Sequence, residues 1–228
     1  AVTSGLTDRR VTALALSPTY PSDSTLWAVS WEEGVFVTMD GGSSWSSADE
    51  GLTTNDQADI LDRPHFDQIR IASPRGPDKP PTMFLAGFDG LFRSNGTSAW
   101  EELDTQVPSN IVGLAVSPDY ADDATVAIAT YLNGAFLSRD GGETWSAINT
   151  GLATKFEWTR RSDYVARLLG IWFSPTYTTD DRMFASLRGR LLTSTDGGEL
   201  WTSQTPPGLL ARDEFPPDHI LMAFSPAF

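Results

Sequence analysis

An acidic glycine turn closed by a tryptophan recurs along the chain, and its spacing constrains the possible folds more than any other feature. Three copies keep the full pattern, namely Thr38 to Trp45, Ser138 to Trp145 and Ser194 to Trp201, and a degenerate copy runs from Arg93 to Trp100. A Ser-Pro step precedes every one of these tryptophans at a nearly constant distance, at Ser17-Pro18, Ser73-Pro74, Ser117-Pro118 and Ser174-Pro175, and Ser225-Pro226 begins a further unit. Self-similarity at a fixed period indicates a repeat architecture.

The composition excludes several classes of protein. A chain of 228 residues with 40% hydrophobic content can bury a large core, and its apolar runs are too short to span a membrane, so we expect a soluble protein. With 30 acidic and 16 basic residues, a net charge of -14 disfavours nucleic-acid and anionic-membrane binding. The absence of cysteine excludes disulfides, thiolate metal sites and cysteine nucleophiles. No phosphate-cradling glycine loop or dinucleotide fingerprint is present, so we expect no cofactor.

Each repeat contains four short apolar runs separated by turns. In the first repeat the runs are Val11 to Ser17, Thr25 to Ser30, Gly34 to Met39 and Trp45 to Ala48, and in the third they are Ile111 to Ser117, Thr125 to Thr130, Ala135 to Arg139 and Trp145 to Ile148. Runs of this length, rich in β-branched and aromatic residues and bounded by Gly, Asp and Pro, predict antiparallel strands. No long amphipathic helix is indicated. The sequence therefore predicts an all-β fold, a β-propeller of four-stranded antiparallel blades.

The acidic turn has a structural explanation. The aspartate can accept hydrogen bonds from backbone N–H groups just downstream, the glycines tolerate positive φ, and the tryptophan can bury its ring against the sheet. The positions predicted to have this role are Asp40, Gly42, Trp45, Asn95, Trp100, Asp140, Gly142, Trp145, Asp196, Gly198 and Trp201. Asn95 can still form an Asx turn, but its copy lacks the second glycine, so we expect a looser hairpin there.

These turns resemble the Asp-box, or BNR, repeat, whose pattern is Ser/Thr-x-Asp-x-Gly-x-Thr-Trp. The sequences from Ser117 to Tyr120 and from Gly134 to Ser138 are similar to those of bacterial BNR propellers related to photosystem II assembly factors and sortilin-type domains. The resemblance implies a propeller whose boxes lie on the outer rim, away from the central channel. It implies no single function, because sialidases, xyloglucanases, receptors and assembly factors carry such boxes.

The repeats predict the blade boundaries. Residues 1–7 are expected to form the outer strand of a preceding blade, and residues 211–228 the inner strand of a following one. The complete blades are predicted at 8–52, 53–107, 108–152 and 153–210. Together they form one propeller over 1–228, or a section of a larger one. We favour the section, because a ring closed by the two ends would leave one blade without its middle strands and expose sheet edges.

The default binding surface is the rim opposite the acidic turns, where loops joining second to third strands meet the links between blades. Aromatic and charged side chains concentrate in these loops, as large-area contact residues do at polar interfaces. The candidate residues are Trp31, Glu32, Phe88, Tyr131, Trp158, Arg160, Arg161, Tyr164, Arg188 and Arg190. The alternative is that each packs beneath its own loop; the segment from Lys155 to Arg167 gathers the most such residues.

Metal and catalytic sites find little support. His65 and His219 are isolated, so no zinc spacing exists. Asp119, Asp122 and Asp123 could take calcium, but we interpret them as part of a strand-to-strand turn like that at Asp23. A glycosidase needs two carboxyl groups facing one cleft, and abundance of carboxylates does not supply that geometry.

We therefore predict a non-catalytic interaction or scaffold propeller of an exported or cell-surface protein. Its partner is expected to be another protein or other copies of the chain, with carbohydrate as a further option. Two alternatives stay open: a glycoside hydrolase fragment of sialidase or xyloglucanase type, and a structural subunit of a filament or surface coat.

Overall fold

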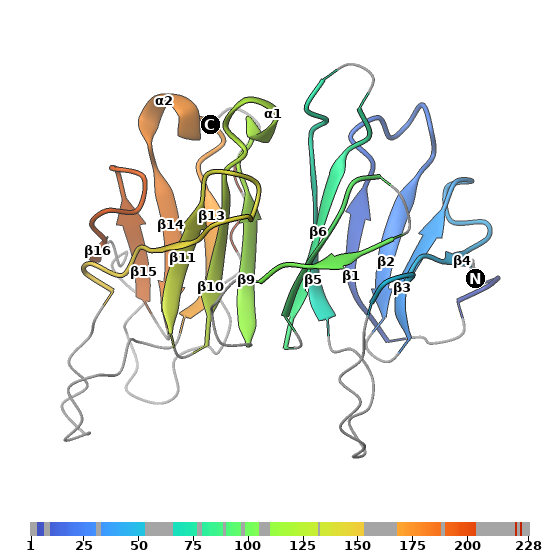
Figure 1. The fold of residues 1–228 in the computed structure, drawn as a ribbon, viewed down its shortest axis with the longest axis horizontal. Helices are drawn as coiled ribbons and strands as arrows, with labels where there is room; N and C mark the ends of the chain where they lie inside the picture. Colours follow the sequence, from blue (N-terminus) through green and yellow to red (C-terminus); the bar gives the residue numbers. More distant parts are fainter. Residues whose placement is uncertain are drawn as a thin grey trace, which may run out of the picture. The chain divides into compact units, whose positions relative to one another are not determined.

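The computed structural model describes residues 4–6, 10–30, 33–52, 66–76, 79–88, 90–96, 99–104, 110–131, 133–152, 168–187, 190–203, 222 and 224. The chain divides into two compact units, which comprise residues 1–104 and residues 105–228. Each unit contains two four-stranded antiparallel sheets, and within every sheet the strands are neighbours in chain order (Figure 1). Each sheet is thus a meander, as the sequence predicts.

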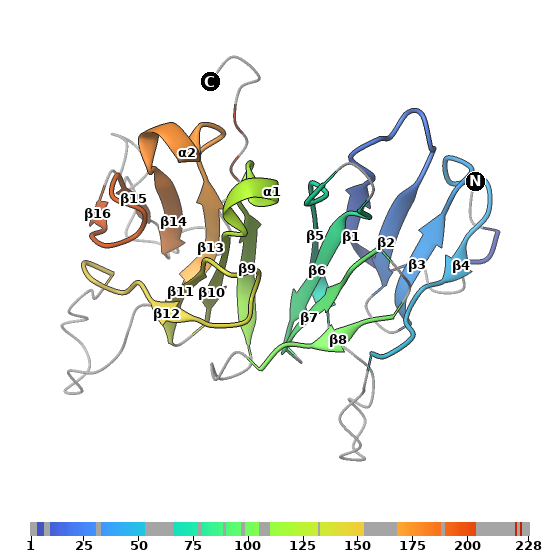
Figure 2. The same ribbon diagram turned by 45° about the horizontal axis from the view of Figure 1, so that its top comes forward.

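The first unit contains the first and second sheets. The first sheet consists of β1 (Val11–Leu16), β2 (Leu26–Ser30), β3 (Gly34–Thr38) and β4 (Ser46–Ser47). The second sheet consists of β5 (Phe66–Ala72), β6 (Thr82–Gly87), β7 (Gly90–Ser94) and β8 (Glu101–Glu102). Figure 2 shows β5 to β8 side by side in this order.

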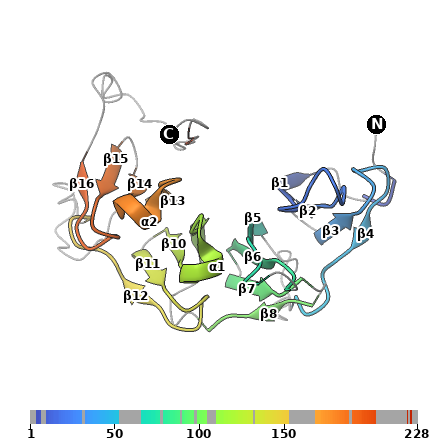
Figure 3. The same cartoon turned by 90° about the horizontal axis from the view of Figure 1, so that it is seen from above.

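The second unit contains the third and fourth sheets and two helices of one turn each. The third sheet consists of β9 (Ile111–Val116), β10 (Val126–Thr130), β11 (Gly134–Ser138) and β12 (Ser146–Ala147), with α1 (Tyr120–Asp123) between β9 and β10. The fourth sheet consists of β13 (Leu168–Phe173), β14 (Met183–Leu187), β15 (Arg190–Ser194) and β16 (Thr202–Ser203), with α2 (Tyr177–Asp180) between β13 and β14 (Figure 3).

The core of each unit lies between its two sheets. In the first unit Val29 and Val35 of the first sheet pack with Phe66 and Ile69 of the second, and all four side chains are at most 1% exposed. The ring of Phe66 also meets that of Phe92 edge-on, with centroids 5.3 Å apart. Each large side chain buried in this way stabilises the fold by about 1.5–3 kcal/mol. Neither sheet could bury this apolar face alone, so the two sheets of the unit stabilise each other.

A β-bulge near the start of the first strand recurs in all four sheets. The pairing register shifts between Val11 and Ala13 in β1, and equivalent shifts occur in the pairings of β5, β9 and β13. A bulge leaves one residue unpaired and redirects it. In β1 this residue is Thr12, whose hydroxyl donates to the carbonyl of Val29 at 3.2 Å and to the carbonyl of Phe66 in the second sheet at 3.1 Å. The bulge therefore helps to join neighbouring sheets.

The observed strands agree with the expected all-β meander, with two differences. The short helices α1 and α2 were not predicted, because one helical turn leaves no periodicity to detect. The fourth strands of the first and third sheets, Ser46–Ser47 and Ser146–Ala147, are shorter than predicted. In the first sheet this strand begins after Trp45, because the N–H of Trp45 bonds to the carbonyl of Ser4 at 2.9 Å, outside its own sheet. Within the described residues no helix is long and apolar enough to cross a membrane.

Candidate functional site

The three full acidic turns have the same polar geometry. In each, one carboxylate oxygen accepts the backbone N–H four residues later: Asp40 from Ser44 at 2.9 Å, Asp140 from Thr144 at 2.9 Å, and Asp196 from Leu200 at 3.0 Å. The same oxygen accepts the hydroxyl two residues earlier, on Thr38, Ser138 or Ser194, at 2.6–2.7 Å. The carboxylate therefore closes its own hairpin.

These hydrogen bonds lower the pKa of all three carboxyls. For Asp40 the bond from the Ser44 hydroxyl is the largest cause, and for Asp196 the bond from the Ser194 hydroxyl is. Partial burial raises the pKa of Asp140, but the hydrogen bonds from Thr144 and Ser138 outweigh it and lower the value to about 2. Carboxylates whose charged form is stabilised by such donors stay ionised at neutral pH, so none of the three can serve as a proton donor.

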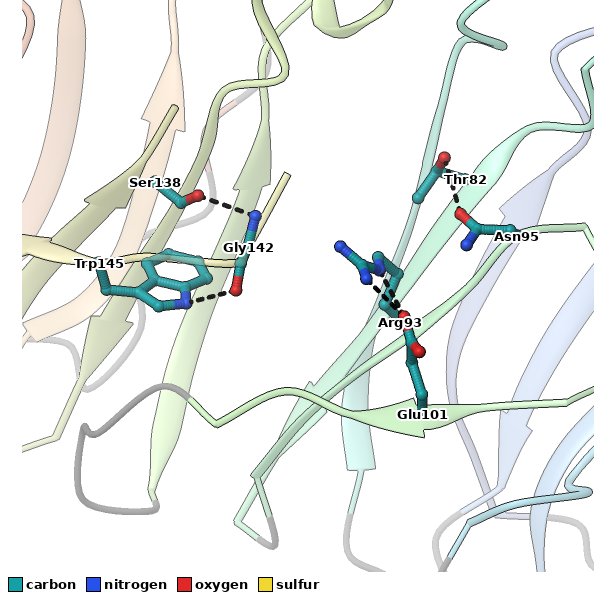
Figure 4. A network of polar contacts seen from close by, with 7 residues as sticks. All are labelled: Thr82, Arg93, Asn95, Glu101, Ser138, Gly142 and Trp145. Carbon is teal, nitrogen blue, oxygen red and sulfur yellow. Dashed lines mark hydrogen bonds and ion pairs between the residues drawn. The ribbon is translucent and has the colours of Figure 1, made fainter. Parts of the chain in front are cut away.

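The glycines of these turns adopt conformations that other residues avoid. Gly142 has φ of 99°, and its N–H bonds to the Ser138 hydroxyl at 2.8 Å, while its carbonyl accepts the indole N–H of Trp145 at 3.0 Å (Figure 4). Positive φ is accessible to glycine at little cost. The turn therefore satisfies its polar groups internally, as expected of a structural element.

Two of the tryptophans bond to the preceding sheet and not to their own. The indole N–H of Trp100 donates to the carbonyl of Ala48 at 2.8 Å, and that of Trp201 donates to Ile148 at 2.8 Å. Both side chains are buried, at 4% and 2% exposed. The sequence predicted burial of the ring but missed this partner, which lies about 50 residues away and leaves no local signal. We call this contact the indole clasp.

The degenerate turn of the second sheet is built differently. The side-chain oxygen of Asn95 accepts a hydrogen bond from the Thr82 hydroxyl at 3.3 Å, and Arg93 on β7 pairs with Glu101 on β8 at 2.8 Å (Figure 4). Strands β7 and β8 are thus linked by an ion pair, next to the position where the other sheets use the aspartate.

The acidic turns lie at the end of each sheet that also carries the Ser-Pro loop between the first and second strands. The N–H of Gly41 bonds to the carbonyl of Ser24 at 3.0 Å, and Gly141 and Gly197 make the equivalent bonds to Ala124 and Asp181. Because the strands of each sheet alternate in direction, the loop between the second and third strands lies at the opposite end. The predicted rim and the acidic turns therefore occupy opposite ends of each sheet.

The acidic residues of the Ser-Pro loops are also used internally. Asp123 accepts the Ser117 hydroxyl at 2.6 Å and the backbone N–H of Thr125 at 2.8 Å, and Asp180 is held in the same way by Ser174 and Arg182. In the first sheet the Ser17 hydroxyl is the largest cause of the lowered pKa of Asp23. Among the described residues no group of three His, Cys, Asp or Glu side chains is arranged to hold a metal ion. These residues form the turns that the sequence indicated.

Only part of the candidate rim falls within the described residues. Phe88, between β6 and β7, is 61% exposed, and Tyr131, between β10 and β11, is half-buried. Arg190 is the first residue of β15. The other candidates lie outside the described residues, namely Trp31, Glu32, Trp158, Arg160, Arg161, Tyr164 and Arg188. The second sheet thus has an exposed aromatic side chain, Phe88, at the end opposite its degenerate turn. The rest of the rim stays a prediction.

One pair of charged residues on an inner strand was not singled out by the sequence. Asp67 and Arg70 of β5 are both exposed; the protein atoms around Asp67 still raise its pKa by desolvation, and the positive charge of Arg70 opposes this shift. Arg70 also donates to the carbonyl of Ile69 at 2.9 Å. Asp67 occupies the bulge position of β5, where β1 has Thr12. Among the described aspartates and glutamates it is the one whose pKa is raised.

No protein-family model and no curated protein matches the chain. Solved structures do match. The xyloglucanase of family GH74 from Xanthomonas campestris has a TM-score of 0.59 and 15% identity over 83% of this chain and 29% of its own. YCF48 from Cyanidioschyzon merolae has a TM-score of 0.54 and 17% identity over 85% and 56%. The extracellular domain of BT4673 from B. thetaiotaomicron has a TM-score of 0.52 and 13% identity over 87% and 22%.

These likenesses concern the fold alone. At 13–17% identity the matched structures support a propeller-like arrangement of antiparallel four-stranded sheets. The chain spans less than two thirds of the length of each of them. Functions differ among proteins that share such a fold, so the site must carry the functional argument.

Proposed function

We propose that the chain is a non-catalytic interaction module, a propeller or propeller section of Asp-box type, that binds a protein partner through the rim opposite its acidic turns. The observation that carries this proposal is the contrast between the two ends of the sheets. At one end Asp40, Asp140 and Asp196 are bonded within their own turns, where the exposed apolar side chains are the aliphatic Met39 and Leu200; at the other end lies Phe88, the exposed aromatic side chain among the described residues, at 61%. An exposed aromatic side chain among loops rich in Trp, Tyr and Arg is typical of a binding surface.

An exported or cell-surface location belongs to the same proposal. It is supported by the likeness to the extracellular domain of BT4673 and to PorZ, a bacterial surface component of a type-IX secretion system.

The test compares the two ends of the sheets in one binding assay. A synthetic peptide library displaying acidic, basic and aromatic residues is screened on the purified chain, and the best peptide is measured by calorimetry. We expect Phe88→Ser and the double change Trp158→Ala with Arg161→Ala each to weaken its binding at least about tenfold, with melting temperature unchanged. Asp140→Ala should lower the melting temperature and leave the binding constant unchanged. Binding that depends on Asp140 and is indifferent to all three rim residues would contradict the proposal.

A second candidate function is glycoside hydrolysis, and Asp67 is the observation that favours it. A raised pKa helps to keep a carboxyl protonated, as a general acid must be, and the matched GH74 structure from Xanthomonas campestris is a xyloglucanase; the reaction also needs a second carboxyl facing the same cleft. Release of reducing ends from xyloglucan that disappears in Asp67→Asn would favour this function over the interaction module. Equal, background release by both proteins would remove it.

A further inference from the structure

One face of the first sheet exposes large apolar side chains. Val11, Leu14 and Leu16 of β1 point to this face and are 39%, 62% and 58% exposed. The opposite face of the same strand carries Ala13 and Ala15, which pack against the second sheet. Contiguous exposed leucines on a strand mark a surface that normally has a partner.

The same positions are buried in sheets that have a preceding sheet to pack on. Phe66 and Ile69 of β5 correspond to Val11 and Leu14, and they are 0% and 1% exposed against the first sheet. In the second unit Leu168 and Ile171 of β13 are 0% and 2% exposed in the core that they share with the third sheet. The second and fourth sheets thus present large side chains toward the sheet that precedes each of them in its own unit.

The first strand of the preceding sheet contributes small residues to these contacts. In the first unit β1 offers Ala13 and Ala15 to the second sheet, beside the larger Val29 and Val35, and in the second unit β9 offers Ala115 to the fourth sheet. The approach is close enough that a side chain at Gly113 of β9 would meet the Cα atom of Gly170 of β13 at 3.0 Å. Large side chains against small ones interdigitate at the density of a protein core. Val11, Leu14 and Leu16 therefore form the large half of such an interface.

The outer edge of the first sheet carries the matching contact. The backbone N–H of Trp100 bonds to the carbonyl of Glu50 at 2.7 Å, and the backbone N–H of Trp201 bonds to the carbonyl of Thr150 at 2.9 Å. These bonds tie the second sheet to the end of the first and the fourth sheet to the end of the third. The backbone N–H of Trp45 bonds in the same way to the carbonyl of Ser4 at 2.9 Å. Like Gly51 beside Trp100, Gly5 lies so close to the carbonyl oxygen of Trp45 that a Cβ atom would be 2.1 Å from it. Ser4 to Leu6 thus take the place that the end of a preceding sheet takes elsewhere.

We propose that the face of the first sheet bearing Val11, Leu14 and Leu16 docks a further four-stranded blade whose first strand presents alanine- or glycine-sized side chains and whose last strand leads into Ser4. The backbone bond from Trp45 to Ser4 favours this occupant over a second copy, because the docked blade must be continuous with that residue. The inference goes beyond the proposed function, since it concerns a sheet face and not the rim, and either can fail without the other.

The test supplies such a blade from the chain itself. A second copy of residues 108–149, whose first strand presents Ala115, is placed directly before Ser4 in place of residues 1–3. The chain has no cysteine, so Leu16→Cys gives a single thiol whose reaction with a water-soluble reagent reports on the face. We expect the rate constant to fall by about tenfold or more in the extended chain, because reaction then requires local opening. Met39→Cys, at a side chain 73% exposed in the acidic turn, is the matched control and should react equally in both chains.

A second extension, a copy of residues 8–49 with its own Ala13 and Ala15, tests the same face with an independent sequence. Protection of the thiol in at least one folded extended chain supports the proposal. Equal reactivity in the extended and original chains overturns it, as does failure of both extensions to give a folded protein by circular dichroism. Protection already present in the original chain would assign the face to one of its own segments, and protection that grows with protein concentration would assign it to a second copy; either result overturns the proposed occupant.

Discussion

The acidic turn of the third sheet and the degenerate turn of the second sheet separate two roles that the motif combines. In the third sheet Asp140 closes its hairpin through Thr144, and Trp145 bonds within the same turn. In the second sheet the aspartate is replaced by Asn95, yet Trp100 is buried and bonds to the carbonyl of Ala48 in the preceding sheet. The carboxylate therefore serves its own hairpin, whereas the indole can hold two sheets together without it.

If the indole clasp joins the sheets, its loss should cost the most. Trp100→Ala removes a side chain 4% exposed together with its hydrogen bond to Ala48, and we expect the free energy of unfolding to fall by about 3–5 kcal/mol. Trp145→Ala, at a half-buried ring bonded to its own turn, is the matched control and should cost clearly less. Urea unfolding followed by circular dichroism measures both. Equal losses would mean that the clasp contributes nothing beyond a local contact.

The second largest loss of stability is expected at Gly51, which lies close to the backbone of Trp100. Its φ is 84°, and a Cβ atom there would lie 2.2 Å from the carbonyl oxygen of Trp100, so Gly51→Ala combines backbone strain with a clash against backbone. We expect a loss of about 2–4 kcal/mol. Gly41→Ala is the matched control, since its φ is 69° but its Cβ would meet nothing closer than 4.0 Å, and it should cost about 1 kcal/mol. A loss at Gly51 no greater than that at Gly41 would show that the second sheet can shift to make room.

Loss of the Asp140 carboxylate should have the smallest effect on the free energy of unfolding, and this effect should depend on pH. Its hydrogen bonds are solvent-exposed, so Asp140→Asn should lower the free energy of unfolding at pH 7 by only about 1 kcal/mol. The pKa of Asp140 is about 2 in the folded protein and about 3.9 in an unfolded chain. Its contribution is therefore complete above pH about 4 and is lost as the pH falls toward 2.

Comparing stability at pH 7 and at pH 2.5 for wild type and Asp140→Asn measures this contribution. The difference between the two proteins should shrink at the lower pH. Asn95→Ala serves as the neutral control, and its effect should be the same at both pH values because an amide does not titrate. A difference between wild type and Asp140→Asn that is constant with pH would contradict the assigned role of the carboxylate.

Much of the local structure could be predicted because its signals are local. The alternation of apolar residues indicated strands close to their observed bounds, for example Val11–Leu16 for the predicted run Val11 to Ser17. The bonds of Asp40 to residues within its own turn follow from the spacing of aspartate, glycine and hydroxyl groups. The helices α1 and α2 were missed, since a single turn between two strands has no pattern of its own.

The candidate site could be predicted only in part. The position of the rim opposite the acidic turns follows from antiparallel connectivity, and Phe88 is exposed there. The raised pKa of Asp67 could not be anticipated, because it depends on how the groups around a bulge on an inner strand pack. Most of the predicted rim residues, Trp158 and Arg161 among them, lie outside the described residues, so their role stays a prediction.

The sequence by itself determined the repeat, the strands and the chemistry of each acidic turn, since these depend on residues a few positions apart. Only the tertiary structure decided which sheet each tryptophan holds and which face of β1 lies open. Trp100 reaches a carbonyl 52 residues away, and Leu14 is 62% exposed while its counterpart Ile69 is 1% exposed. The same local pattern meets different surroundings in each sheet, and burial and hydrogen-bond partners are properties of those surroundings.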